Sequence, residues 1–250
     1  MTTGAGPMDG VGEIAVLPVM AAEQEYGPAL RERISPLITG IGPVEAAIAL
    51  TATLSRLEAG DAMPDLIVSL GSCGSRDLEH AAVYQVSEVG YRDMDASPLG
   101  FAKGVTPYLD LPSVLALPCP VPGIPTARLS TGGDIISGAA YDGIDADMAD
   151  METYALLRVA QTFGVPLVAL RGVSDGRTEL TGLTDWTATL GQVDQNLALA
   201  WDKLTEVMAR DGLSALACVP ALRLDPAALG GPEPASPKPA PSTPASDPET

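Results

Sequence analysis

The chain is poor in the residues on which the commonest catalytic sites depend. It has one histidine, His80, among 250 residues, which argues against a Ser-His-Asp triad and most other mechanisms that use imidazole. It contains neither a Walker phosphate-binding loop nor a G-x-G-x-x-G sequence, the glycine-rich patterns typical of nucleotide cofactor sites. Cys73 lies in a nucleophile-like GSCGS segment, but no base accompanies it, and we interpret it as a small packing residue.

Cysteines and long apolar runs are also scarce. Cys73, Cys119 and Cys218 show no metal-ligand spacing, so we expect reduced thiols, no bound metal and a cytoplasmic protein. No uncharged stretch of about 18 apolar residues occurs, which argues against a membrane span. The first ten residues have neither the basic start nor the apolar run of a signal peptide, so none is expected.

Basic residues are few beside acidic ones. The chain has 14 Lys and Arg against 32 Asp and Glu, and its formal net charge is −18. A surface this acidic repels phosphate backbones and anionic lipids, so we expect no nucleic-acid or membrane partner. Aromatic residues make up only 4% of the chain and hydrophobic residues 46%; the core is therefore expected to consist mainly of Ala, Leu, Val and Ile.

The chain does contain a regular alternation of two kinds of segment. Continuous apolar runs of strand length indicate strands covered on both faces, and Ala-rich or amphipathic segments between them indicate helices. The predicted strands are residues 13–20, 36–42, 65–71, 82–89 and 165–170, and the predicted helices are residues 21–34, 43–57, 150–164 and 186–210. This order predicts an α/β fold, a single three-layer domain with a central mixed, mainly parallel sheet flanked by helices.

The two ends of the chain differ in composition from its middle. Residues 1–11 are a Gly-rich segment that we expect to be a flexible leader, and residues 12–222 are the predicted folded domain. Residues 223–250 are rich in Pro and Ala, cannot bury much apolar area, and are predicted to form a disordered tail. Residues 90–125 are irregular and rich in Pro and Gly, which is typical of a functional loop or lid.

Polar residues follow the predicted strands at their carboxyl ends, where open α/β sheets bind ligands. The carboxylates and hydroxyls found there or at the start of the helix at residue 150 are Glu23, Ser72, Asp150, Glu152, Ser174 and Asp175, with Arg171 beside them. Carboxylates without a metal cluster favour glycosyl chemistry, in which one carboxyl group activates water and another protonates the leaving group. The sequence therefore predicts a cofactor-free site for breaking a glycosidic bond.

Six segments in one order carry a more specific signal. They are VLPVMAAEQEY, ITGIGPVEAA, SLGSCGS, YRDMDASPLGF, STGGDII and DMETYALLRVAQTFGVPLVALRGVSDG. Together they resemble the methylthioadenosine/S-adenosylhomocysteine nucleosidase family of the nucleoside phosphorylase/nucleosidase superfamily. The first is similar to that family's first strand with its Met-x-x-Glu sequence, and the last to its helix–strand–Ser-Asp signature. A single match of this kind is unspecific, whereas six in order are specific.

The resemblance implies hydrolysis of the N-glycosidic bond of 5′-methylthioadenosine, S-adenosylhomocysteine or a related 5′-modified adenosine, with release of adenine and the free thio-sugar. Asp175 would be the acid that protonates or hydrogen-bonds N7 of the leaving adenine. Glu23 would accept a proton from the attacking water, and Glu152 would bind the ribose hydroxyls. An apolar pocket suits the acid, because burial raises the pKa of a carboxyl group and keeps it protonated near neutral pH.

The same resemblance implies the rest of the substrate site and the assembly. Ser72 would lie near the ribose and the water, the Met151 backbone would assist in ribose binding, and Ser174 and Arg171 would orient the acid and the ribose-binding carboxylate. The residues expected to pack on the sugar or the base are Ile41, Met20 and Ile136. The family also implies a homodimer in which a partner's loop, here residues 99–106, completes the pocket.

Some positions depart from the family pattern, and two other functions stay open. Asp150 stands where the family usually has Glu, and Ile135 and Ile136 stand near the place of a Phe that stacks on adenine. A phosphorylase would need cations for phosphate; the anionic MAAEQE segment argues against this, while Arg76 and Arg92 keep it possible. The third hypothesis is a nucleoside-binding protein without catalysis.

Overall fold

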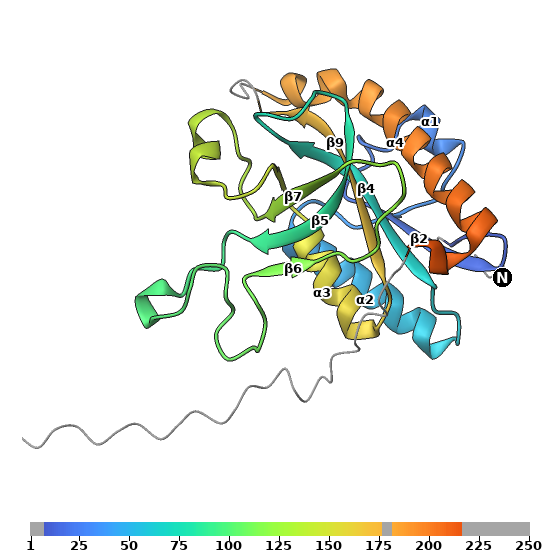
Figure 1. The fold of residues 1–250 in the computed structure, drawn as a ribbon, viewed down its shortest axis with the longest axis horizontal. Coiled ribbons are helices and arrows are strands. Elements are labelled where there is room, and N and C mark those ends of the chain that lie inside the picture. Colours follow the sequence, from blue (N-terminus) through green and yellow to red (C-terminus); the bar gives the residue numbers. More distant parts are fainter. Residues whose placement is uncertain (1–7, 177–181, 217–250) are drawn as a thin grey trace, which may run out of the picture.

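A mixed nine-stranded sheet forms the centre of the protein (Figure 1). This computed structural model describes residues 8–176 and 182–216. The strands are β1 (Asp9–Val11), β2 (Ile14–Met20), β3 (Leu37–Ile38), β4 (Leu66–Gly74), β5 (Val83–Tyr91), β6 (Val114–Ala116), β7 (Thr126–Thr131), β8 (Met148–Asp150) and β9 (Leu167–Asp175). Strand β9 pairs with β4 and β5, β5 pairs with β7, and β8 pairs with β7 and β4. These five strands therefore form a closed ring.

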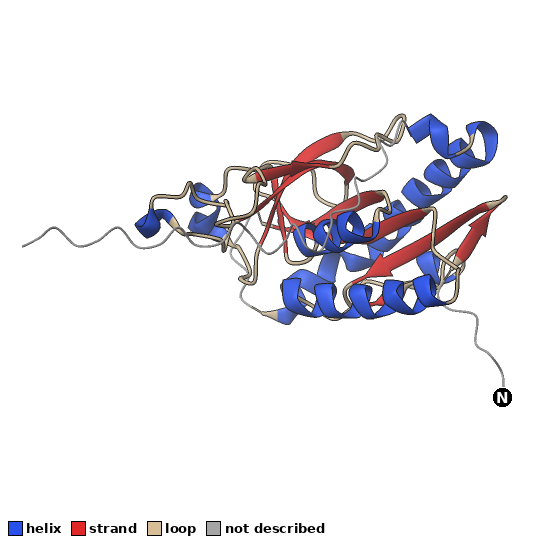
Figure 2. Ribbon diagram, turned by 90° about the horizontal axis from the view of Figure 1, so that it is seen from below, coloured by secondary structure: helices blue, strands red, loops and turns tan. Residues whose placement is uncertain are grey.

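Helices cover both sides of the strands (Figures 1 and 2). The α-helices are α1 (Pro28–Arg31), α2 (Pro43–Ala59), α3 (Thr153–Phe163) and α4 (Leu183–Asp211), and the 3-10 helices are η1 (Ser97–Leu99), η2 (Gly138–Gly143) and η3 (Leu213–Leu216). Helices α2 and α3 pack against each other, as do α1 and α4. The predicted α/β architecture, one domain with a mixed sheet between helical layers, is confirmed.

The core is aliphatic and divided by the sheet. Because successive side chains of a strand point to opposite faces, Ile67 of β4 packs with the α2 and α3 residues, and its neighbours Leu66 and Val68 pack with those of α4. All three side chains are fully buried. Burying one such side chain stabilises the fold by about 1.5–3 kcal/mol, which explains why these strands read as continuous apolar runs.

Several predicted boundaries were wrong near the first strand. Residues 9–11 belong to the sheet as β1, antiparallel to β2, so the flexible leader predicted for residues 1–11 was wrong for these three residues. Of the helix predicted at residues 21–34, only the four residues of α1 are helical. Proline stands at the start of that helix, and the residues before it form turns, because proline has no N–H to continue an earlier helix.

The structure also bears on the predictions for the cysteines, the irregular stretch and membrane-spanning helices. Cys73 is a free, buried thiol, but Cys119 is disulfide-bonded, so the expectation of three reduced cysteines was wrong; Cys218 and the predicted tail lie outside the described residues. The irregular stretch from residue 90 includes the short strand β6 and helix η1. None of the helices that the structure describes is both long and apolar enough to cross a membrane.

Candidate active site

A cavity of about 560 Å³ opens where β2, β4, β8 and β9 end. Its wall contains five carboxylates from different parts of the chain: Glu25, Asp134, Asp150, Glu152 and Asp175. Apolar and aromatic lining comes from Ile41, Ile135, Ile136, Tyr141, Met151 and Trp186. Within the described ranges, no group of three His, Cys, Asp or Glu side chains is placed to hold a metal ion. Such a cavity suits a small organic ligand with several hydroxyl groups.

Glu25 enters the cavity from the turn that follows β2. Its side chain is 7% exposed, and its Oε1 accepts hydrogen bonds from the Ser72 backbone N–H at 2.7 Å and the Ser72 hydroxyl at 2.6 Å. Its Oε2 is buried and has no hydrogen-bond partner among the described residues. Burial raises the pKa of Glu25, against the lowering effect of Ser72 and of the Arg171 charge. An unpaired carboxylate oxygen of this kind can accept a proton from a bound water.

The Glu25 side chain is held by a short chain of hydrogen bonds. The indole N–H of Trp186, near the start of α4, donates to Ser72 Oγ at 3.1 Å, and the Ser72 hydroxyl in turn donates to Glu25. Because the three residues come from α4, β4 and the β2 turn, the packing of these elements fixes the direction of the carboxylate. The free oxygen of Glu25 therefore has a defined position in the cavity.

Asp175 is placed by a close approach between the ends of β9 and β4. It is the last residue of β9 and pairs with Gly74 after a register shift. The next residue, Gly176, has φ +114°, and a side chain there would lie 2.6 Å from the Ser75 backbone. Only glycine fits this conformation and this contact. The glycine of the Ser-Asp-Gly sequence thus allows the chain to hold Asp175 at the cavity.

The environment of the Asp175 carboxyl favours its protonated form. Burial is the main effect and raises its pKa, while the hydrogen bond from Ser174 and the charge of His80 lower it in part. The Ser174 hydroxyl donates to Asp175 Oδ2 at 2.6 Å. Oδ1 lies on the side of Gly74, and no hydrogen bond joins it to another of the described residues. A carboxyl group in this setting can act as a general acid.

Glu152 lies at the start of α3 and faces the first turn of another helix. The backbone N–H of Gly42, the residue before α2, donates to Glu152 Oε1 at 2.8 Å, a favourable place for a carboxylate because helix amino ends carry partial positive charge. Burial, and after it the nearby charge of Asp150, nevertheless raise the pKa of Glu152 to about 8. One oxygen of Glu152 is thereby anchored and the carboxyl group lines the cavity.

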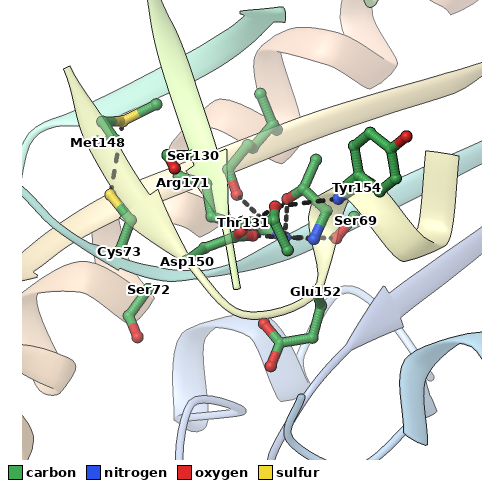
Figure 3. A network of polar contacts seen from close by, with 12 residues as sticks. Ser69, Ser72, Cys73, Ser130, Thr131, Met148, Asp150, Glu152, Tyr154 and Arg171 are labelled. Atoms are coloured by element: carbon green, nitrogen blue, oxygen red, sulfur yellow. Dashed lines mark hydrogen bonds and ion pairs between the residues drawn. The ribbon is translucent and has the colours of Figure 1, made fainter. Parts of the chain in front are cut away.

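A buried ion pair between Arg171 and Asp150 supports this wall (Figure 3). Arg171, 2% exposed, donates from Nε to Asp150 Oδ2 at 3.1 Å, and its Nη2 donates to Ser69 Oγ at 3.0 Å and to Thr153 Oγ1 at 2.7 Å. Asp150 Oδ1 accepts a hydrogen bond from Thr131 at 2.5 Å. The Thr153 hydroxyl donates to Asp150 Oδ2, so the two threonine hydroxyls and Arg171 together complete the contacts of Asp150.

Six of the predicted site residues line the cavity and four do not. Those in its wall are Asp175, Glu152, Met151, Ser72, Ile41 and Ile136. The placement predicted for Glu23 was wrong: its side chain is 61% exposed and forms an ion pair with Arg31 at 2.8 Å. The turn hydrogen bonds from Glu25 N to Ala22 O and from Tyr26 N to Glu23 O direct Glu23 outward and Glu25 inward.

The other three are buried behind the wall. Met20 is 1% exposed and packs in the apolar cluster of the α4 side, so the expected contact with the sugar is corrected to a core contact. Ser174 and Arg171 are also outside the cavity lining. Ser174 contacts Asp175, the acid that it was expected to orient. Arg171 was expected to orient Glu152, but its ion pair is with Asp150.

Sequence reasoning missed Glu25, Trp186 and Tyr141 as cavity residues. The sequence could have indicated Glu25, because it lies two residues after Glu23 and fits the same motif if the turn after the strand is two residues longer. Trp186 was predicted to begin a helix, but no motif marked it as a site residue. Tyr141 lies in η2, a segment that the six matching motifs do not cover, so the sequence pattern had nothing to indicate it.

The cationic side chains considered for phosphate binding are engaged elsewhere. Arg76 is exposed and forms an ion pair with Asp142 at 2.5 Å. Arg92 lines the cavity, but its terminal nitrogens donate to the backbone carbonyls of Ser130, Asp150, Gly132 and Asp134 at 2.5–3.0 Å. These bonds hold the end of β7 and the loop after it. Within the described residues, the cavity therefore offers carboxylates to a ligand far more than cations.

Comparison with known proteins agrees with the resemblance found in the sequence motifs. The family profile described as "Phosphorylase superfamily" matches residues 136–210. The 5′-methylthioadenosine/S-adenosylhomocysteine nucleosidase of Actinobacillus succinogenes is 30% identical over 166 residues, which cover 59% of this chain and 70% of the relative.

Solved structures share the fold at lower identity. The 5′-methylthioadenosine/S-adenosylhomocysteine nucleosidase of Helicobacter pylori, in complex with a pyrrolidinol that carries a 4-amino-pyrrolopyrimidine group, has a TM-score of 0.65 and 16% identity over 76% of this chain and 97% of that one. A futalosine hydrolase mutant of the same organism has a TM-score of 0.65 and 17% identity over 76% and 98%. At such identities the likeness concerns the fold.

Proposed function

Because the chain belongs to the 5′-methylthioadenosine/S-adenosylhomocysteine nucleosidase family, we propose that it hydrolyses the N-glycosidic bond of 5′-methylthioadenosine, S-adenosylhomocysteine or a related 5′-modified adenosine. The products are adenine and the free thio-sugar. The observation that carries the proposal is that the cavity holding the protonatable Asp175 also holds Glu25, whose Oε2 is buried without a partner among the described residues. One cavity thus provides an acid for the base and an acceptor for water.

The two carboxyl groups divide the reaction between them. Protonated Asp175 donates its proton to N7 of the purine as the bond between C1′ and N9 breaks, so that the base leaves neutral. Glu25 accepts a proton from the water whose oxygen bonds to C1′. The sugar passes through an oxocarbenium-like transition state, and each proton transfer contributes roughly 10²–10⁴-fold in rate. Exchange with solvent returns Glu25 to its ionised form and Asp175 to its protonated form.

The remaining residues bind and orient the substrate. The free oxygen of Glu152 accepts hydrogen bonds from the ribose hydroxyls, with its other oxygen held by Gly42. Ile41 and Met151 pack on the sugar, and Ile136 takes the place beside the base. Arg171 acts through Asp150, whose position it fixes. Holding the reacting groups in place in this manner lowers the entropic part of the barrier.

Water suits this cavity better than phosphate as the acceptor. The lining is rich in carboxylates, and the terminal guanidinium nitrogens of Arg92 are bound to backbone carbonyls. A dianion placed there would be repelled. The test is release of adenine from 5′-methylthioadenosine in phosphate-free buffer containing ¹⁸O-water. We expect full activity and one ¹⁸O atom at C1′ of the sugar; a strict requirement for phosphate would overturn the proposal.

We further propose that the protein acts as a homodimer in the cytoplasm. Ile41, Val44 and Ile48 form an apolar strip at the start of α2, and their exposures are 54%, 65% and 59%. Leu99, in the loop expected to reach a partner's pocket, is 76% exposed. Covering such a strip with a second copy would remove apolar area from water. Light scattering that gives the monomer mass for fully active protein would contradict the dimer, and cell fractionation tests the location.

A further inference from the structure

The Tyr141 side chain has an unusual position in the cavity. It comes from η2 (Gly138–Gly143), is 7% exposed, and lines the cavity. Its hydroxyl is buried and has no hydrogen-bond partner among the described residues. A buried hydroxyl without a partner loses its hydrogen bonds to water and is destabilising, so native proteins seldom keep one unless a ligand or water completes it.

The Tyr141 hydroxyl lies next to the carboxyl group of Asp175. A methyl group added at Gly74 would collide with Tyr141 Oη and lie 2.8 Å from Asp175 Oδ1, so both oxygens approach the same point above Gly74. The hydroxyl of Ser174 occupies the other oxygen, Asp175 Oδ2. Tyr141 Oη and Asp175 Oδ1 are therefore neighbouring polar atoms at the same part of the cavity wall.

The tyrosine is a neutral hydroxyl at physiological pH. Burial raises its pKa, and the charge of Asp175 raises it further. A neutral phenol both donates and accepts one hydrogen bond, unlike a carbonyl or an ammonium group. It can therefore pair with either an amino or an oxo substituent of a ligand.

We propose that the Tyr141 hydroxyl binds the 6-substituent of the purine whose N7 is protonated by Asp175. The inference rests on the proposed function and names a further substrate-binding residue for it. In a purine, N7 and the substituent on C6 lie on one edge of the ring system, so two adjacent polar atoms of the wall reach both at once. Tyr141 accepts a hydrogen bond from a 6-amino group, or donates one to a 6-oxo group.

This position makes Tyr141 a specificity-determining residue of a particular kind. It selects purines that carry any hydrogen-bonding group at C6 over purines that carry only hydrogen there. When a purine with only hydrogen at C6 binds, the buried Tyr141 hydroxyl stays unpaired, and its lost hydration weakens the complex. Discrimination between amino and oxo groups must then come from other contacts.

The experiment compares wild type and Tyr141→Phe on two substrates, 5′-methylthioadenosine and its analogue with hydrogen in place of the 6-amino group. We expect Tyr141→Phe to lower kcat/KM for the 6-amino substrate about 10-fold or more and to leave the value for the 6-H analogue within about 3-fold. Tyr84→Phe is the control, since Tyr84 packs against the apolar core; it should change neither value.

Equal losses on both substrates, or no loss on either, would overturn the inference. If the wild-type protein releases no base from either substrate, the proposed function fails instead. In that case calorimetry with free adenine and free purine decides the inference by itself. Weaker adenine binding in Tyr141→Phe, with purine binding unchanged, supports it, and equal effects on the two bases overturn it.

Discussion

Ser72 gives both of its hydrogen-bond donors to one oxygen of Glu25, its backbone N–H at 2.7 Å and its hydroxyl at 2.6 Å. Both bonds stabilise the ionised carboxylate and lower its pKa against the effect of burial. The second carboxylate oxygen is left buried and unpaired in the described structure. Ser72 therefore orients the proposed base and favours its ionised form.

Ser72→Ala tests this relationship through the pH profile. Removal of the hydroxyl takes away one bond to the charged form, so the pKa of Glu25 rises and the base becomes protonated at higher pH. We expect the acidic limb of kcat/KM to move to higher pH and the activity at neutral pH to fall about 10-fold. Ser87→Ala, whose hydroxyl contacts Ala127 O, is the matched control. An unmoved acidic limb in Ser72→Ala would contradict the role.

Asp175→Asn removes the proposed acid with little change in shape. An amide cannot transfer a proton to N7, so we expect kcat to fall by roughly 10²–10⁴-fold. The pocket keeps its other contacts, and 5′-methylthioadenosine binding should remain measurable by calorimetry. Activity within a few-fold of wild type would show that another group protonates the base.

Arg171→Met tests the buried support of the site. It leaves Asp150, 6% exposed, without its ion-pair partner, and breaking a buried pair in this way destabilises a protein by about 3–5 kcal/mol. We expect that loss in the free energy of unfolding by urea. Arg128→Met, at an exposed pair with Asp145, should lose much less. The double variant Arg171→Met with Asp150→Leu should recover part of the loss; no recovery would mean that packing, and not the unpaired charge, is responsible.

The raised pKa of Glu152 predicts that the free energy of unfolding falls as pH rises. Its pKa is about 8 in the folded protein against an ordinary 4.5, so between these values the folded state keeps a proton that the unfolded state has lost. Stability then decreases with pH by up to about 1.4 kcal/mol per pH unit for this group. Urea unfolding at pH 5 and pH 8 should show the decrease, and Glu152→Gln should reduce it. The same slope in Glu152→Gln and in the exposed control Glu45→Gln would contradict the assignment.

The fold could be read from the sequence because its strands are buried on both faces. Runs such as those of β4 and β9 are continuously apolar, since helices cover each side, and their carboxyl ends lead to Ser72 and Asp175. The ring formed by β8 could not be predicted, because a three-residue strand has no periodicity. The six ordered motifs that indicated the fold also contain the six predicted residues that line the cavity.

The site failed to emerge from the sequence where local turns decide direction. Glu23 and Glu25 are both acidic and two residues apart, and only the turn hydrogen bonds after β2 separate the outward side chain from the inward one. Met20 and Arg171 stand at strand positions whose burial a motif does not reveal. Tyr141 comes from a segment with no matching motif. In each case the local turn or the tertiary packing, and not the residue type, decides which side chain reaches the cavity.

The most direct test compares Glu25→Gln with Glu23→Gln for adenine release from 5′-methylthioadenosine in phosphate-free buffer. The two variants make the same chemical change two residues apart, one in the cavity and one in an exposed ion pair with Arg31. We predict that Glu25→Gln loses roughly 10²-fold or more in kcat, while Glu23→Gln keeps nearly full activity. A severe loss in Glu23→Gln with Glu25→Gln active would contradict the account.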